Sequence, residues 1–123
     1  MAKILVVDDN ESILGLIHDF FSDVKGHTVF TADNAAKAME IVEREHPPVA
    51  LLDIMMPDVH GIELLTMIKR AAPDTKVIMI TAVDDEDIAK DAMEKGAADF
   101  LTKPLELNYL DALVTFQLLE SGE

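Results

Sequence analysis

Cysteine and tryptophan are absent from this chain of 123 residues, and tyrosine occurs once. Without cysteine the protein can form no disulfide and can use no thiol as a nucleophile or metal ligand. A chain of this length can nevertheless bury a hydrophobic core without such staples. We therefore expect one domain, over residues 1–123.

Basic residues are scarce, with 10 Lys and Arg against 24 Asp and Glu, and the formal net charge is -14. Such a charge opposes direct binding to nucleic acid or to an anionic membrane, but it favours binding a cation. Most of the acids are expected on solvated helix faces. Only acids at strand ends need another explanation.

Long hydrophobic runs are also missing, although 50% of the residues are hydrophobic. Charged residues interrupt every apolar stretch well before the ~20 residues that a membrane span needs. The apolar part of the N-terminus, residues 4–7, is too short for a signal peptide. The sequence therefore predicts a cytoplasmic protein without a membrane anchor.

Short apolar runs alternate with amphipathic stretches along the whole chain. The predicted strands are Lys3–Val7, Thr28–Ala32, Val49–Asp53, Lys76–Thr81 and about 99–102, and the predicted helices are about 12–24, 34–45, 61–72, 85–95 and 106–120. Such alternation is typical of a parallel sheet with right-handed crossovers and helices on both faces. We expect an α/β fold, a doubly wound five-stranded sheet in the order 2-1-3-4-5.

Helical spacing predicts which side chains of the first four helices face the sheet. The expected inward residues are Ile13, Leu16, Ile17, Phe20 and Val24; Ala35, Ala38, Met39 and Val42; Leu64, Leu65 and Ile68; and Ile88, Ala92 and Met93. Ile13 has a second possible role, because it comes directly after the acidic residues that follow the first strand and could instead be exposed beside them.

The stretch from Val49 to Gly61 organises the rest of the chain. Its apolar run has the composition of a buried parallel strand and ends in a single carboxylate, Asp53. Pro57 stops the strand and Gly61 allows a tight turn. Ligands of open α/β sheets bind beyond the carboxyl ends of the strands, so Asp53 is the first candidate for chemistry.

The predicted strand order places Asp8 and Asp9, after the first strand, beside Asp53 at one edge of the sheet. Three carboxylates in one crevice repel each other unless a cation lies between them. Oxygen ligands and room for water favour Mg²⁺, which usually takes one or two protein carboxylates. We therefore expect a Mg²⁺ site formed by these acids.

Two further strand ends carry groups that suit phosphate chemistry, Thr81 and Lys103. A carboxylate flanked by Mg²⁺ and a lysine can attack a phosphoryl group, because both cations neutralise the oxygens of the transition state. Each acid alone would more often cap a helix or a turn. Their combination with Thr81 and Lys103 favours an aspartyl phosphate at Asp53.

Four motifs in the sequence resemble those of a known protein family. They are Val6-Val7-Asp8-Asp9-Asn10, Leu51-Leu52-Asp53-Ile54-Met55-Met56-Pro57 with Gly61 beyond, Ile80-Thr81-Ala82, and Lys95-Gly96-Ala97-Ala98-Asp99-Phe100-Leu101-Thr102-Lys103-Pro104. From Lys3 to Leu118 the chain resembles the receiver domains of two-component response regulators, in particular chemotaxis-regulator-like ones. The resemblance implies a flavodoxin-like (βα)5 fold and a phosphorylation-controlled switch. It implies no enzyme activity beyond the chain's own phosphorylation and dephosphorylation.

The resemblance also implies a role for each matched residue. Asp53 would accept a phosphoryl group from a phosphohistidine of a histidine kinase or phosphotransfer protein. Asp9, Asp53 and the backbone carbonyl of Met55 would bind Mg²⁺ directly, and Asp8 would act largely through water. Lys103, often followed by a cis bond to Pro104 in this family, would pair with the phosphate. Thr81 and Phe100 would be the switch pair.

Met55 and Val83 stand two residues after the phosphoacceptor and two after the switch threonine, positions that vary among receivers. Both are apolar here, so neither side chain can orient a hydrolytic water by hydrogen bonding. We expect a phosphoryl group that lasts longer than in receivers with polar residues there.

Helix 106–120 carries two apolar stripes, whereas a surface helix needs one. Leu107, Leu110, Val114 and Leu118 are expected to pack on the sheet, and Tyr109, Ala112, Leu113, Phe116 and Leu119 form a stripe on roughly the opposite side. Exposed apolar patches usually mark a partner surface. We expect a second copy or a downstream effector there.

Two other functions fit parts of the pattern. A Mg²⁺-dependent small-molecule phosphatase or phosphotransferase would share the aspartyl phosphate, but it normally needs a cap that this chain has no residues to build. An FMN-binding module would need a Ser, Thr or Gly-rich phosphate loop after the first strand, where Asp8, Asp9 and Glu11 would repel phosphate. The four histidines share no spacing that would suggest zinc binding or phosphorylation.

Overall fold

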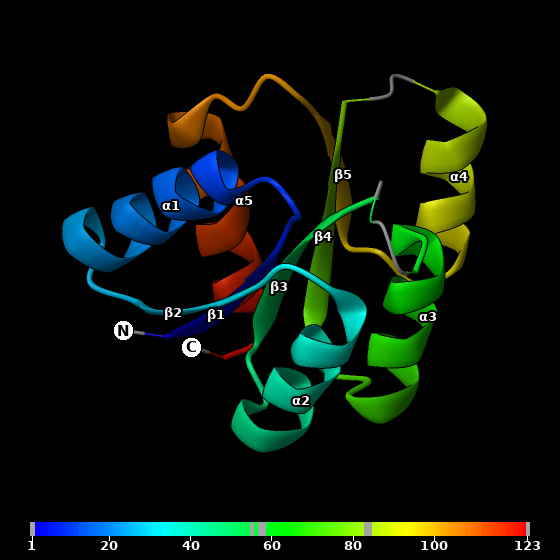
Figure 1. The fold of residues 1–123 in the computed structure, drawn as a ribbon, viewed down its shortest axis with the longest axis horizontal. Coiled ribbons are helices and arrows are strands. Elements are labelled where there is room, and N and C mark those ends of the chain that lie inside the picture. The colour runs from blue at the N-terminus through cyan, green and yellow to red at the C-terminus, as the bar shows by residue number, and fades with distance from the viewer. Residues whose placement is uncertain (1, 55, 57–58, 83–84, 123) are drawn as a thin grey trace.

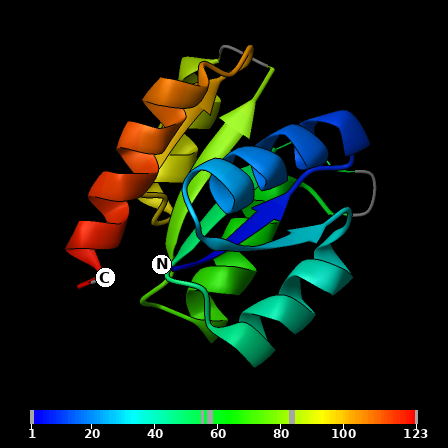
Figure 2. The same ribbon diagram turned by 90° about the vertical axis from the view of Figure 1, so that its left-hand side faces the viewer.

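A single five-stranded parallel sheet lies between two layers of helices (Figures 1 and 2). The computed structural model describes residues 2–54, 56, 59–82 and 85–122. The strands are β1 Lys3–Val7, β2 Thr28–Ala32, β3 Val49–Asp53, β4 Lys76–Thr81 and β5 Asp99–Thr102. The helices are α1 Glu11–Asp19, a π-helix η1 Phe20–Val24, α2 Ala35–Glu45, α3 Gly61–Ala71, α4 Glu86–Glu94 and α5 Leu107–Glu120. The sheet order β2-β1-β3-β4-β5 confirms the prediction.

Helices cover both faces of the sheet, and each strand contributes to the core on both sides, because its successive side chains point in opposite directions. Leu5 and Val7 of β1 join the core under α2, α3 and α4, whereas Ile4 and Val6 join the core under α1, η1 and α5. The same alternation explains why the strands read as continuous apolar runs. Within the described part of the chain, no helix has the length and apolar character to cross a membrane.

The first predicted helix is interrupted. The α-helix ends at Asp19 and continues as the π-helix η1, in which the N–H of Lys25 donates to the carbonyl of Phe20. Phe21 is fully buried, because it lies four residues after Ile17 on the same face, and its ring packs edge-to-face with that of Phe20. The wider turn rotates the residues that follow it. The prediction was wrong for Leu16 and for Val24, which are 50% and 69% exposed.

Most other inward residues lie where helical spacing placed them. Leu64, Leu65 and Ile68 of α3 are fully buried, and Ile13 is half-buried against the α1–α5 core. Met93 of α4 was predicted to face inward, but it is 47% exposed, while its neighbour Ala92 is buried. The short α4 covers the edge strand β5, so only a narrow face of this helix meets the core.

Helix α5 has the two faces that the sequence predicted, except at Leu107 and Leu113. Leu107, predicted to pack on the sheet, is only half-buried. Leu110, Val114 and Leu118 are buried against the sheet, whereas Tyr109, Phe116 and Leu119 are 55%, 55% and 67% exposed. Leu113 was assigned to the outer stripe, but it is half-buried and packs against the core. It lies on the flank of the helix, because at 100° per residue it is turned about 60° from Phe116 and about 60° from the buried Leu110. The outer stripe, here named the α5 stripe, is Tyr109, Ala112, Phe116 and Leu119.

His27, just before β2, makes the stability of the fold depend on pH. Its Nδ1 accepts a hydrogen bond of 3.1 Å from the backbone N–H of Ala2, which requires an unprotonated Nδ1. Burial lowers the pKa of His27 below its ordinary value of 6.5. The unfolded chain therefore binds the proton more readily, and the stabilisation is present above the unfolded pKa and is lost as pH falls below it.

We expect the unfolding free energy of the parent protein to fall more steeply between about pH 7 and about pH 5 than that of His27→Gln, which keeps an acceptor but cannot titrate. Urea unfolding of both proteins across this range measures the difference, and the other histidines and acids are common to both. Parallel curves would contradict the prediction.

Candidate phosphoacceptor and metal site

The carboxyl ends of β1 and β3 bring three carboxylates together. These strands pair in parallel, with Val7 opposite Leu52, so the next residue of each strand is Asp8 and Asp53. One carboxylate oxygen from each of Asp8, Asp9 and Asp53 lies within 4.8 Å of the other two. The topological switch point of the sheet, between β1 and β3, therefore holds the acids that the sequence singled out.

The three acids differ in exposure and in partners. Asp8 and Asp53 are 3% and 6% exposed, whereas Asp9 is open to solvent. Asp8 Oδ1 accepts a hydrogen bond of 2.9 Å from the backbone N–H of Asn10. The side chain of Asn10 in turn caps α1 by accepting from the N–H groups of Ser12 and Ile13. Asn10, one of the N-cap candidates in the sequence, thus fixes Asp8 and the start of α1 together.

Lys103 reaches this cluster from the end of β5. Its backbone N–H donates to the carbonyl of Thr81 at 2.7 Å, and its bond to Pro104 is cis. The ammonium lies 3.1 Å from Asp8 Oδ2 and 3.5 Å from Asp53 Oδ2, and the lysine side chain is 18% exposed. The cation is therefore held between the two buried carboxylates.

One ammonium against three carboxylates leaves the site with an excess of negative charge. The donor atoms are all carboxylate oxygens, and the solvent-exposed Asp9 leaves room for water on one side. Mg²⁺ prefers such a set, with few protein carboxylates and several waters. The residues present therefore fit a hard divalent cation. Among the described residues this is the one group of acids close enough to hold a metal ion.

Thr81 and Phe100 lie on the same face of the sheet. Met79 pairs with Phe100 and Thr81 pairs with Thr102, so Thr81 and Phe100 are diagonal neighbours on adjacent strands. Thr81 is fully buried, and Phe100 is half-buried and packs against the core under α2, α3 and α4. Both therefore lie on the face that α4 covers.

The start of α3 lies closely against the end of β3. Gly61, the first residue of α3, donates its N–H to the carbonyl of Ile54 at 2.7 Å. A Cβ on Gly61 would lie 2.5 Å from the carbonyl oxygen of Asp53 and 2.5 Å from the Cα of Ile54. The sequence predicted a turn glycine here, and the structure adds that this glycine packs on the backbone of Asp53.

Three residues named from the sequence lie outside the described part of the chain. They are Met55, expected to bind Mg²⁺ through its carbonyl, Val83, expected with Met55 to set the lifetime of the phosphoryl group, and Pro57, expected to stop the third strand. Their roles stay predictions.

Comparison with known proteins identifies the family of this site. The response regulator receiver domain family matches residues 4–115. The chemotaxis protein CheY of Listeria monocytogenes is 35% identical over 114 residues, which are 92% of this chain and 96% of that protein. Sporulation initiation phosphotransferase F of Bacillus subtilis is 34% identical over 121 residues, which are 98% and 97%.

Solved structures and longer relatives agree with this assignment. The CheY-like receiver domain protein from Methanospirillum hungatei superimposes with a TM-score of 0.94 at 29% identity, covering 99% of this chain and 97% of that one. A cyclic di-GMP phosphodiesterase of Thermotoga maritima is 36% identical over 115 residues, but the chain spans 30% of that protein. The enzyme name therefore describes a protein with a large part that has no counterpart here.

Receiver domains bind Mg²⁺ at an acidic cluster of the kind formed by Asp8, Asp9 and Asp53, and they interact with histidine kinases or phosphotransfer proteins. The match extends over most of the chain, and it includes the strand ends on which the site is built. The chain belongs to the receiver domains of two-component response regulators, a family of phosphorylation-controlled signalling switches.

Proposed function

We propose that Asp53 accepts a phosphoryl group from a phosphohistidine of a histidine kinase or phosphotransfer protein, and that residues 1–123 act as a single receiver domain. The observation that carries this proposal is the Lys103 ammonium held 3.5 Å from Asp53 Oδ2, beside a cluster of three acids. A buried carboxylate with a fixed cation next to it is suited to bind the oxygens of an incoming phosphoryl group.

In the proposed transfer, one carboxylate oxygen of Asp53 attacks phosphorus. The O–P bond to Asp53 forms as the N–P bond to the donor histidine breaks, and the imidazole nitrogen keeps the electron pair of that bond. Lys103 pairs with phosphoryl oxygens that gain charge in the transition state. Its contact with Asp8 holds the ammonium in place before the donor arrives.

Asp9, Asp53 and the backbone carbonyl of Met55 would hold Mg²⁺ directly, and Asp8 would act through water. When bound, Mg²⁺ would supply a second positive charge opposite the phosphoryl oxygens. The different environments of the acids support this division. Both oxygens of Asp8 already accept hydrogen bonds, from Asn10 and from Lys103, whereas the carboxylate of Asp9 is exposed.

Thr81 and Phe100 would pass the event to the surface. In this proposal the hydroxyl of Thr81 turns toward the phosphoryl group, and the ring of Phe100 moves into the space that it leaves. Their diagonal placement on β4 and β5 supports this, because a change at Thr81 alters the packing next to Phe100. Both residues lie under α4, so this helix and β5 would feel the change.

Intact mass spectrometry tests the phosphoacceptor directly. Incubation with a small-molecule phosphodonor and Mg²⁺ is expected to add one phosphoryl group to the parent protein and none to Asp53→Ala. Removal of Mg²⁺ with a chelator should abolish the gain. A phosphorylated Asp53→Ala protein, or a parent that never gains the mass under these conditions, would contradict the proposal.

We also propose that the α5 stripe, with neighbouring parts of α4 and β5, binds a second copy of the chain or a downstream effector. The stripe exposes a tyrosine, a phenylalanine and a leucine on the side of α5 that faces away from the sheet. Aromatic anchors of this kind dominate the energetics of many interfaces.

Phe116→Asp is expected to weaken this interaction by at least about tenfold, because it puts a charge into an apolar contact. Sedimentation of the phosphorylated protein and titration of its effector measure the effect. Val24→Asp is the matched control, since Val24 is also an exposed apolar residue but lies on η1. If Phe116→Asp changes neither the molecular mass in solution nor any partner affinity, the α5 stripe is not the interface.

A further inference from the structure

A second surface feature lies on the other side of the sheet, between α3 and α4. These helices run next to each other over the face opposite α5 (Figure 1). A groove of about 560 Å³ separates them. Its apolar lining comes from Ile62 and Met67 of α3 and Ile88 of α4, and charged side chains stand along its rim.

The charges on the rim are arranged by position along α3. Glu63 lies near the start of the helix and Arg70 near its end, about 10 Å apart at 1.5 Å per residue. On the α4 side Lys95 pairs with Asp91, so these two charges largely cancel each other. The groove therefore presents one acidic and one basic end.

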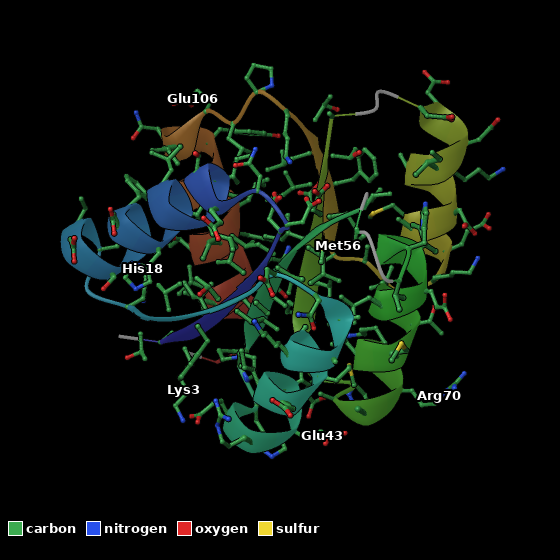
Figure 3. The ribbon with its side chains drawn as sticks, viewed as in Figure 1. Lys3, His18, Glu43, Met56, Arg70 and Glu106 are labelled. Carbon is green, nitrogen blue, oxygen red and sulfur yellow. The ribbon has the colours of Figure 1, made fainter. Side chains whose placement is uncertain are left out.

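Arg70 is unusual among the basic side chains. Most of the others pair with a carboxylate, and Lys69 donates to the carbonyls of Pro73 and Thr75. Within the described residues, the side chains of Arg70, Lys76 and Lys90 form no ion pair or hydrogen bond, and of these three only Arg70 lines the groove. Figure 3 shows its side chain projecting from the end of α3 away from the sheet. An arginine in this position is free to bind a carboxylate of a partner.

We propose that this groove binds an amphipathic α-helix of a partner protein, lying antiparallel to α3. Its apolar ridge would contact Ile62, Met67 and Ile88, an acidic side chain would meet Arg70, and a basic side chain would meet Glu63. Helices favour acids in their first turn and bases in their last turn. The complementary helix therefore has its N-terminus at Arg70, the C-terminal end of α3, which fixes its direction.

The expected preference for an acidic first turn at Arg70 is the opposite of what the overall negative charge of the protein would favour. A net charge of -14 attracts any basic helix, wherever it lands. A requirement for an acidic first turn at Arg70 can arise only from the local arrangement of charges. The groove also lies on the opposite face of the sheet from the α5 stripe, so a helix bound here leaves that stripe open to another partner.

Two synthetic peptides of about 20 residues, long enough to form a helix in water, serve as probes. Both carry leucine along one face at every third or fourth position. The first has Asp and Glu in its first turn and Lys and Arg seven residues further along, about 10 Å away, to match the spacing of Arg70 and Glu63. The second has these acidic and basic positions exchanged, so composition and net charge are identical. Binding is followed by amide chemical shifts of the unphosphorylated protein, which separates this test from the proposed phosphorylation.

The first peptide is expected to shift the resonances of α3 and α4 and to bind at least about tenfold more tightly than the second, since two ion pairs become two repulsions on exchange. Arg70→Glu should remove this difference. Lys90→Glu changes the net charge equally, on α4 but outside the groove, and should preserve it. Phe116→Asp should also leave binding unchanged.

Three results would overturn the proposal. The two peptides could bind equally or not at all, which would mean that the rim charges do not select a helix. Arg70→Glu and Lys90→Glu could have the same effect, which would mean that the net charge of the protein alone explains the binding. The shifts could map to α5, which would place the peptide on the α5 stripe.

Discussion

Replacing Lys103 with Met is expected to slow phosphorylation of Asp53 by about 10²–10³-fold, the usual cost of removing one positioned donor from a site that stabilises developing negative charge. Methionine keeps the unbranched shape and most of the length of the side chain but removes the ammonium that lies 3.1 Å from Asp8 and 3.5 Å from Asp53. The rate of mass gain from a small phosphodonor, at saturating Mg²⁺, measures the loss.

The same substitution should lower stability when Mg²⁺ is absent. Asp8 and Asp53 are almost fully buried, and without Lys103 they face each other with no ammonium between them. We expect a loss of about 1–3 kcal/mol in the free energy of unfolding, below the value for a fully enclosed pair because Lys103 is partly exposed. Added Mg²⁺ should restore more stability to Lys103→Met than to the parent, since the metal would replace the missing charge.

Lys3→Met is the matched control for both measurements. Lys3 also pairs with a carboxylate at 3.1 Å, that of Glu45, but its side chain is half exposed and lies at the opposite end of β1 from the site. Its removal should change stability by less than about 1 kcal/mol and leave the phosphorylation rate unaltered. If Lys103→Met is phosphorylated within about threefold of the parent rate, the ammonium has no part in transition-state stabilisation.

The site was predictable from the sequence to the extent that topology decides it. Asp8, Asp9 and Asp53 follow strands whose ends must meet once the sheet order is 2-1-3-4-5, so their convergence needs no knowledge of side-chain geometry. Which acid is buried, and which one Lys103 approaches most closely, depends on the turn after β1. There the N–H of Asn10 fixes one oxygen of Asp8 and leaves the other for Lys103. That turn has no sequence signal apart from the capping asparagine.

The prediction of which helix side chains are buried was also limited by features that the sequence does not signal. Spacing at 3.6 residues found Ile17 and the inward face of α3, but it misplaced Val24, because η1 has a wider turn that no residue in Phe20–Val24 announces. Met93 was misassigned for a different reason. Its spacing suits a helix that covers the middle of a sheet, whereas α4 covers the edge strand β5 and buries only a narrow face.

Gly61→Ala is expected to destabilise the protein by about 3 kcal/mol, because overpacking against rigid atoms forces the backbone to move. The added Cβ would lie 2.5 Å from both the carbonyl oxygen of Asp53 and the Cα of Ile54, and neither is the end of a flexible side chain. The movement must also disturb the 2.7 Å hydrogen bond from Gly61 to Ile54. Urea unfolding measures the loss in stability.

Gly15→Ala is the matched control for this change. Gly15 lies inside α1, and a Cβ there would meet no atom within 4 Å. Alanine should therefore raise stability by roughly 0.5–1 kcal/mol, since glycine is the less favourable residue in a helix. A Gly61→Ala protein that unfolds at the same urea concentration as the parent would show that the loop can shift without cost.

Phosphorylation of the two glycine variants separates a loss of fold from a loss of geometry. Asp53 is displaced with its backbone in Gly61→Ala, so we expect the folded fraction of this variant to gain the phosphoryl group at least about tenfold more slowly, in line with the cost of misplacing a reacting group. Gly15→Ala should react at the parent rate. If folded Gly61→Ala also reacts at the parent rate, close packing of α3 on the strand end serves stability alone, and the position of Asp53 is set by its pairing in the sheet and its contact with Lys103.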